Sequence, residues 1–82
     1  MEKDNYKKYK EMNSKKMIYI ADDDKEMRFI ITEALSEYYN TMTFENGKLL
    51  LEFIDKSDSN PDLYLLDIKM PGLNGIETAK LI

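Results

Sequence analysis

The chain has 82 residues, of which 43% are apolar and 34% are charged, and its formal net charge is −4. This length suits one small domain at most, and no apolar run approaches the roughly 20 residues that a membrane-spanning helix needs. The sequence contains neither cysteine nor histidine, which excludes disulfides, thiolate metal sites, Ser-His-Asp catalysis and most zinc sites. Any bound metal should therefore be a hard ion held by oxygen, such as magnesium, manganese or calcium.

The net charge and the first residues of the chain indicate which kinds of partner to expect. An acidic net charge argues against direct nucleic-acid binding, because the phosphate backbone is bound by basic surfaces. The opening Met1-Glu2-Lys3-Asp4-Asn5 leads into more charge rather than into the apolar stretch of a secretory signal. We therefore expect a cytoplasmic protein with neither membrane nor direct nucleic-acid contacts.

Residues 1–15 form a polar N-terminal extension that differs in composition from residues 16–82. Tyr6, Tyr9 and Met12 lie three residues apart, a spacing that fits a weakly amphipathic helix. A solvated tail is the alternative interpretation. The domain proper is expected to occupy residues 16–82.

From residue 16 onward, strand-like and helix-like patterns alternate. Residues 17–21 are continuously apolar, as in a strand buried on both faces. Asp24 can cap a following helix, with Glu26 favourably placed in its first turn. That helix carries apolar residues at helical spacing, namely Met27, Ile30, Ile31, Ala34, Leu35 and Tyr38.

The same alternation continues through the second half of the chain. A short β-like run at 41–45 ends at Asn46-Gly47, and Leu49, Leu50, Phe53 and Ile54 then form a second helical stripe. After a loop at 57–61 come a third strand at 62–67, a loop at 70–74 and a helix at 75–82. This order predicts an α/β fold with a parallel sheet and right-handed crossovers.

Acidic residues follow two of the predicted strands. Asp22, Asp23 and Asp24 come after the first strand, and Asp67 ends the third. In such folds ligands bind beyond the carboxyl ends of the strands. Two unit charges about 5 Å apart at an effective dielectric of about 20 repel by roughly 3 kcal/mol. The cluster therefore predicts a cation site, in which Asp24 is more simply explained as a helix cap.

These residues resemble the receiver domain of two-component response regulators. The acidic triplet followed by Lys25-Glu26-Met27-Arg28 resembles the acidic pocket of that family. The segment Leu65-Leu66-Asp67-Ile68-Lys69-Met70-Pro71-Gly72-Leu73-Asn74-Gly75 resembles its phosphorylation segment. The resemblance covers residues 16–82 and implies a partial receiver domain, with a flavodoxin-like parallel sheet reduced to three strands and flanking helices.

The resemblance implies a role for each site residue. Asp67 matches the aspartate that accepts a phosphoryl group, and Asp22 and Asp23 match the acidic pair that holds Mg²⁺ together with it. Lys69 matches the position whose backbone carbonyl is a further metal ligand. The implied function is that of a phosphoacceptor signalling module in a two-component phosphorelay, served by a histidine kinase or phosphotransfer protein. It is not an enzyme beyond self-phosphorylation and dephosphorylation at Asp67.

The family pattern also extends beyond the residues that match here. A complete domain has five strands and five helices, and carries a Ser or Thr after the fourth strand and a Lys after the fifth. Neither position is matched, so we expect this chain alone to be phosphorylated far more slowly than a complete receiver, or not at all, and its switching to be doubtful. The strand ending at Asp67 would border the fourth strand. An apolar sheet edge left open there predicts either homo-oligomers through that edge or a chain that is part of a longer product.

Two other functions are compatible with the residues. The chain could be a non-signalling interaction or oligomerisation protein that keeps the receiver-like sheet without productive phosphorylation. Asp22-Asp23-Asp24 also satisfies the Asp-x-Asp pattern of haloacid-dehalogenase-like phosphatases, but the following Lys25-Glu26 departs from that family's pattern.

Overall fold

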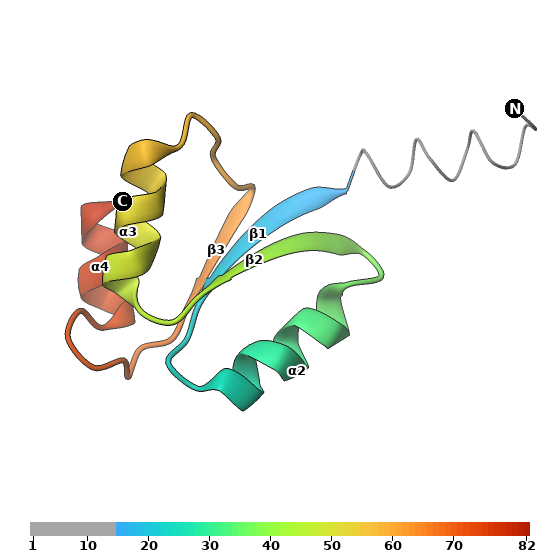
Figure 1. Cartoon of the computed structure of the whole chain (residues 1–82), viewed down its shortest axis with the longest axis horizontal. Coiled ribbons are helices and arrows are strands. Elements are labelled where there is room, and N and C mark those ends of the chain that lie inside the picture. The colour runs from blue at the N-terminus through green and yellow to red at the C-terminus, as the bar shows by residue number, and fades with distance from the viewer. Residues whose placement is uncertain (1–14) are drawn as a thin grey trace, which may run out of the picture.

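The computed structural model describes residues 15–82, in which three strands alternate with three helices. The strands form one parallel sheet in the order β2-β1-β3. Helix α2 lies on one side of this sheet, and α3 and α4 lie on the other (Figure 1). The elements are β1 (Lys16–Ala21), α2 (Lys25–Leu35), β2 (Tyr39–Phe44), α3 (Gly47–Lys56), β3 (Leu63–Leu66) and α4 (Gly75–Leu81).

This arrangement confirms the predicted fold class, a three-stranded parallel sheet with flanking helices. The predicted polar extension, residues 1–15, lies outside the described residues except for Lys15.

Strand β1 is the centre of the fold, because it pairs with both other strands and its last four residues are all buried. Successive side chains of a strand point to opposite faces. Tyr19 and Ala21 face α3 and pack in one cluster with Leu50. Ile18 and Ile20 therefore point to the face that α2 covers, as the continuous apolar run predicts.

Aromatic rings fill the layer between the sheet and α3. The ring of Tyr19 meets those of Phe44, Phe53 and Tyr64 edge-on, with centroids 5.8, 5.6 and 6.0 Å apart. Such pairs contribute about 0.5–1.5 kcal/mol each beyond their buried area. Tyr19 and Tyr64 are therefore packing residues of this layer. Burial raises the pKa of the Tyr64 hydroxyl above its ordinary 10.0, and the neighbouring Tyr19 raises it further.

The structure corrects the predicted boundary between α2 and β2. The helix ends at Leu35, so Tyr38 lies in the following turn, where its N–H donates to the Leu35 carbonyl at 3.0 Å. Strand β2 begins at Tyr39 rather than at residue 41, because its ladder with β1 starts with Tyr39 opposite Lys16. Helical spacing alone could not reveal this, since Tyr38 fits the helical stripe and the strand register is a tertiary property.

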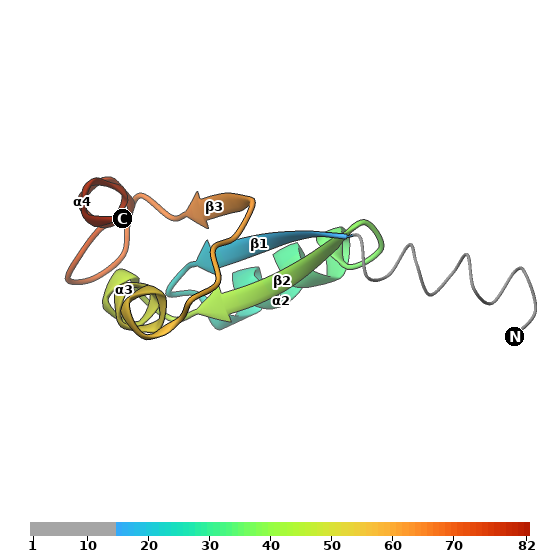
Figure 2. The same cartoon turned by 90° about the horizontal axis from the view of Figure 1, so that it is seen from above.

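The packing of α2 also differs from the prediction. Ile31 and Leu35 are half-buried, but Met27 and Ile30 from the same predicted stripe are exposed, and no residue of α2 is buried. Of the three strands, β2 has the most contacts with this helix, and β3 lies farther away along the sheet (Figure 2). The apolar stripe is therefore wider than the sheet surface that α2 covers.

Strand β3 has one covered face and one open face. Tyr64 and Leu66 pack against the buried cluster, whereas Leu63 and Leu65 are 55% and 41% exposed. Leu63 pairs with Ile18 and Leu65 with Ile20, so these exposed leucines lie on the α2 side of the sheet. We refer to Leu63 and Leu65 as the open β3 face.

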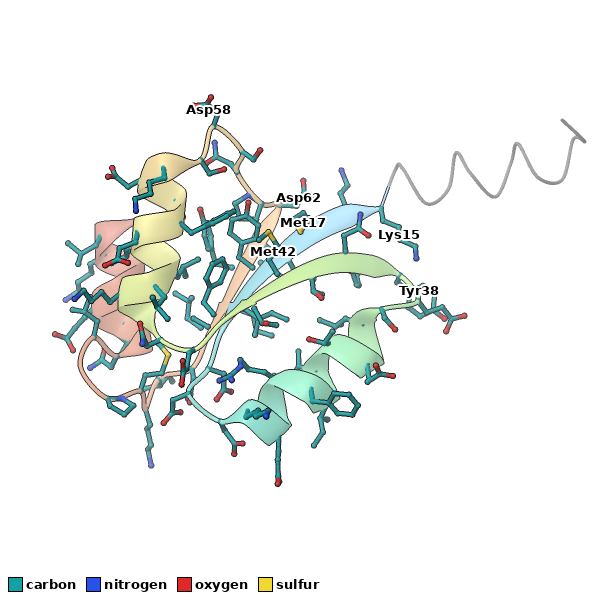
Figure 3. The ribbon with its side chains drawn as sticks, in the orientation of Figure 1. Lys15, Met17, Tyr38, Met42, Asp58 and Asp62 are labelled. Carbon is teal, nitrogen blue, oxygen red and sulfur yellow. The ribbon has the colours of Figure 1, made fainter. Side chains whose placement is uncertain are left out.

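Asp62 fixes the start of β3 to β1. Its carboxylate Oδ2 accepts from the Met17 N–H at 2.7 Å, and its own N–H donates to the Met17 carbonyl at 2.8 Å (Figure 3). The sequence indicated only that Asp62 begins the strand. The contact shows that it also sets where β3 lies along β1, and therefore where Asp67 lies.

Replacing Leu50 by Ala is expected to lower the free energy of unfolding by about 2–5 kcal/mol, because a buried leucine leaves a cavity. Leu50 is 0% exposed at the centre of the α3 interface. Urea denaturation followed by circular dichroism measures the change. The matched control is Leu49→Ala on the same helix, where the side chain is 43% exposed and the loss should be much smaller. Equal losses would contradict this description of the core.

Candidate functional site

Three carboxylates meet beyond the ends of β1 and β3. One oxygen from each of Asp22, Asp23 and Asp67 lies within 4.8 Å of the others. Asp22 is only 9% exposed, Asp67 is half-buried and Asp23 is exposed. The structure thus brings together the three aspartates that the sequence analysis singled out, at the predicted edge of the sheet.

Main-chain contacts hold Asp22 in the loop after β1. The Asp22 N–H donates to the Phe44 carbonyl at 3.1 Å, which continues the ladder with β2. The Asp22 carboxylate Oδ1 accepts from the Asp24 N–H at 2.9 Å. Asp24 Oδ1 in turn accepts from the N–H groups of Glu26 and Met27, at 2.9 and 3.2 Å. Asp24 is therefore the helix cap that was predicted, with its carboxylate directed to α2.

The segment after β3 holds Asp67 in a similar way. Its N–H donates to the Ala21 carbonyl at 2.9 Å, and its carboxylate Oδ1 accepts from the Lys69 N–H at 3.1 Å. Met70 belongs to the same buried cluster as Tyr19, Ala21 and Leu50. The main chain around Asp67 is therefore held on one side by Ala21 of β1 and on the other by the buried side chain of Met70. The role of the Lys69 carbonyl as a metal ligand stays a prediction.

Helix α4 begins directly against the end of β3. A Cβ atom on Gly75 would collide with the Asp67 carbonyl oxygen and lie 2.8 Å from its carbonyl carbon. Asn74 and Glu77 cap the helix reciprocally, with distances of 2.8 and 3.3 Å. Gly72 has a φ of 75°, which glycine adopts readily. These contacts fix the main chain that carries Asp67.

Gly75 and Arg28 are site residues to which the sequence analysis gave no role. Glycine within a helix is unfavourable relative to alanine. A glycine at the start of a predicted helix could therefore have indicated a close approach of the main chain at Gly75. The Arg28 Nη1 donates to the Asp22 carbonyl at 2.7 Å. An arginine four residues after the helix cap carries no signal of that contact, because surface arginines are common on helices.

The donor set fits a magnesium ion. Mg²⁺ prefers oxygen ligands at about 2.0–2.1 Å and usually binds one or two carboxylates while keeping several waters. Oxygens within 4.8 Å of one another suit such a partly hydrated ion. Each of Asp22 and Asp67 uses Oδ1 for a main-chain N–H, which leaves Oδ2 for a cation.

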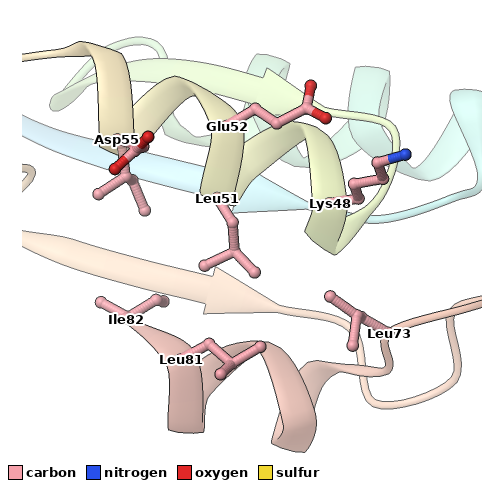
Figure 4. A pocket seen from close by; sticks show the side chains of 8 residues that line it. Lys48, Leu51, Glu52, Asp55, Leu73, Leu81 and Ile82 are labelled. Atoms are coloured by element: carbon pink, nitrogen blue, oxygen red, sulfur yellow. The ribbon is translucent and has the colours of Figure 1, made fainter.

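A separate groove lies between α3 and α4 (Figure 4). Its floor is apolar, with Leu51, Leu73 and Leu81, and its rim carries Lys48 and Glu52. None of the three clustered aspartates lines it. The groove is therefore distinct from the acidic site.

A three-stranded parallel sheet with this acidic cluster beyond its strand ends defines a receiver-type domain. Residues 18–82 match the family described as the response regulator receiver domain, and the chain belongs to that family. Receiver domains are signalling modules that typically bind Mg²⁺ at an acidic cluster and interact with histidine kinases or phosphotransfer proteins.

Curated relatives include sporulation initiation phosphotransferase F of Bacillus subtilis, which is 41% identical over 70 residues, covering 84% of this chain and 53% of that protein. The DNA-binding transcriptional regulator NtrC of Escherichia coli is 37% identical over 67 residues, covering 80% of this chain and 14% of NtrC. The chain therefore spans about half of the first relative and a small part of the second.

Solved structures agree with this assignment. The receiver domain of Francisella response regulator 1452 aligns with a TM-score of 0.72 and 31% identity, covering 80% of this chain and 54% of that one. The N-terminal domain of a response regulator receiver protein from Methanoculleus marisnigri aligns with a TM-score of 0.70 and 30% identity, covering 79% and 52%. None of the helices in residues 15–82 has the length and apolarity needed to cross a membrane.

Asp23→Asn is expected to stabilise the metal-free chain by up to about 1 kcal/mol, the scale of exposed charge pairs. It removes one of three mutually repelling carboxylates. The same change should reduce the stabilisation that millimolar Mg²⁺ gives, because a ligand is lost. Thermal unfolding with and without Mg²⁺ measures both effects.

Asp58→Asn is the control for this experiment, because it makes the same charge change in the exposed loop before β3 and should leave both quantities nearly unchanged. Equal or lower metal-free stability of Asp23→Asn would count against the clustered site.

Proposed function

We propose that this chain is a phosphoacceptor module of a two-component phosphorelay, in which Asp67 receives a phosphoryl group. Asp22, Asp23 and Asp67 would hold Mg²⁺, with the Lys69 backbone carbonyl as a further ligand. The observation that supports these roles is the meeting of the three carboxylates within 4.8 Å at the segment that matches the family. The donor is proposed to be a histidine kinase or phosphotransfer protein in the cytoplasm.

The chemistry follows from the placement of Asp67. A carboxylate oxygen attacks phosphorus, a new O–P bond forms, and the bond from phosphorus to the donor nitrogen breaks, so that the electron pair leaves with the donor. An anion must approach a dianionic group, and a bound Mg²⁺ would reduce that repulsion. The residues supply orientation: Lys69 N–H and Asp67 Oδ1 are already paired, which limits rotation of the attacking carboxylate.

Incubating the chain with a small acyl phosphate and Mg²⁺ is expected to add one phosphoryl group to Asp67. Intact-mass spectrometry measures the product. Asp67→Asn and chelation of Mg²⁺ should each abolish it, whereas Asp58→Asn should not. The reaction should be slower than in a complete receiver domain, because no residue here matches the Lys that contacts the phosphoryl group, and such contacts often contribute a few kcal/mol.

Two outcomes would change this proposal. Labelling as fast as in a complete receiver domain would show that the unmatched positions are dispensable. No labelling of a folded, Mg²⁺-stabilised chain would favour the second function below.

A second proposed function is that of an interaction module that associates through β3. Strand β3 ends the sheet, so within residues 15–82 its outer side pairs with no strand. Unpaired main-chain groups at a sheet edge accept a further strand, and the open β3 face adds apolar surface beside them. A second copy meeting this edge about a two-fold axis would pair the two strands antiparallel.

Leu65→Lys is expected to abolish concentration-dependent dimers seen by sedimentation velocity, because it places a charge on the open β3 face. Leu49→Lys is the matched control, since Leu49 and Leu65 have nearly equal exposure, 43% and 41%, and Leu49 lies on α3. A wild-type chain that stays monomeric at every concentration, or equal dimerisation of both variants, would contradict association through β3.

A further inference from the structure

Arg28 makes a contact that links α2 to the end of β1. It is the fourth residue of α2, and its own N–H donates to the Asp24 carbonyl at 2.9 Å as part of the helix. Its half-buried side chain turns back along the helix, and Nη1 donates to the Asp22 carbonyl at 2.7 Å. The helix is thereby joined to the loop that carries two of the clustered aspartates.

The Asp22 carbonyl that Arg28 contacts lies between the two aspartates of the loop. It belongs to the peptide unit that joins Asp22 to Asp23, and a peptide unit is planar. Holding its oxygen therefore restricts rotation of the whole unit, and with it the directions in which the Cβ atoms on either side can point. The N–H of Asp22 is held by the Phe44 carbonyl of β2. The carbonyl of Asp22 is held by Arg28.

We propose that Arg28 is a positioning residue that keeps the carboxylates of Asp22 and Asp23 directed at the same point as that of Asp67. The proposal rests on the metal role proposed above for those three residues. Arg28 is not one of the proposed metal ligands, and it acts through the peptide that it holds. It is thus an outer partner of the ligands, of the kind whose loss typically weakens metal affinity about 10–100-fold.

Charge and positioning act in opposite directions, which makes the proposal testable. Removing a cation near three carboxylates strengthens the attraction of the site for a divalent ion. Removing an orienting hydrogen bond weakens the binding of that ion. Lys25, also at the start of α2 and exposed, offers the same charge change without the hydrogen bond.

The experiment measures Mn²⁺ affinity by electron paramagnetic resonance for the wild-type chain and three variants. Arg28→Met is expected to bind about tenfold more weakly, and Lys25→Met as tightly as wild type or more tightly. Arg28→Lys keeps the charge and a donor on a shorter, single-point side chain, so its affinity should lie between wild type and Arg28→Met. Arg28→Met that binds as tightly as Lys25→Met would overturn the proposal.

A metal-free measurement separates this proposal from the metal role itself. Amide hydrogen exchange at Asp24 reports on the loop, because that N–H donates to Asp22 Oδ1. Arg28→Met should speed exchange at Asp24 more than at the Leu50 amide in α3, and Lys25→Met should not. A wild-type chain that fails to bind Mn²⁺ would refute the metal role, and with it ligand positioning. Unchanged exchange at Asp24 would refute the positioning alone.

Discussion

Every other element of this domain takes its place from the burial of β1. The strand has neighbours on both edges and apolar contacts on both faces, so its main-chain groups and its side chains are both satisfied. Helix α3 packs on it through Leu50 and the ring of Tyr19. The strand ends at Ala21, and the chain turns back there toward α2. The first two aspartates lie at that reversal. The acidic cluster is thus a consequence of where a strand buried on both faces must stop.

The three carboxylates repel one another, and their closeness is imposed by contacts that lie outside the cluster. Main-chain donors hold Asp22 and Asp67, while Met70 anchors the segment after Asp67 in the core. The close approach of Gly75 to the Asp67 carbonyl keeps α4 against the same segment. A site assembled in this way keeps its negative charge concentrated before any cation arrives. Such a pre-arranged cluster suits the proposed binding of a small, strongly hydrated ion.

Local patterns in the sequence were sufficient to predict the order of the elements, the parallel sheet and the closeness of Asp22, Asp23 and Asp67. They were sufficient because strand ends in a parallel sheet must share an edge. They could not place the end of α2, since Tyr38 satisfies the helical spacing while the register with Lys16 decides where β2 begins. Nor could they show the exposure of Leu63 and Leu65, because an apolar residue in a strand does not reveal whether a helix covers it. Arg28 was missed because its partner is a carbonyl, which leaves no trace in side-chain patterns.

The contact between Asp62 and Met17 also has a consequence for the order in which the domain folds. These residues are 45 positions apart, whereas β1 and β2 are joined by a single helix. Closing a longer stretch of chain costs more entropy, and distant pairings form more slowly. Strand β3 is therefore expected to join a β1-α2-β2 unit that has already formed. Asp67 arrives with it, so the repulsion of Asp67 by Asp22 and Asp23 opposes the step in which β3 joins the sheet.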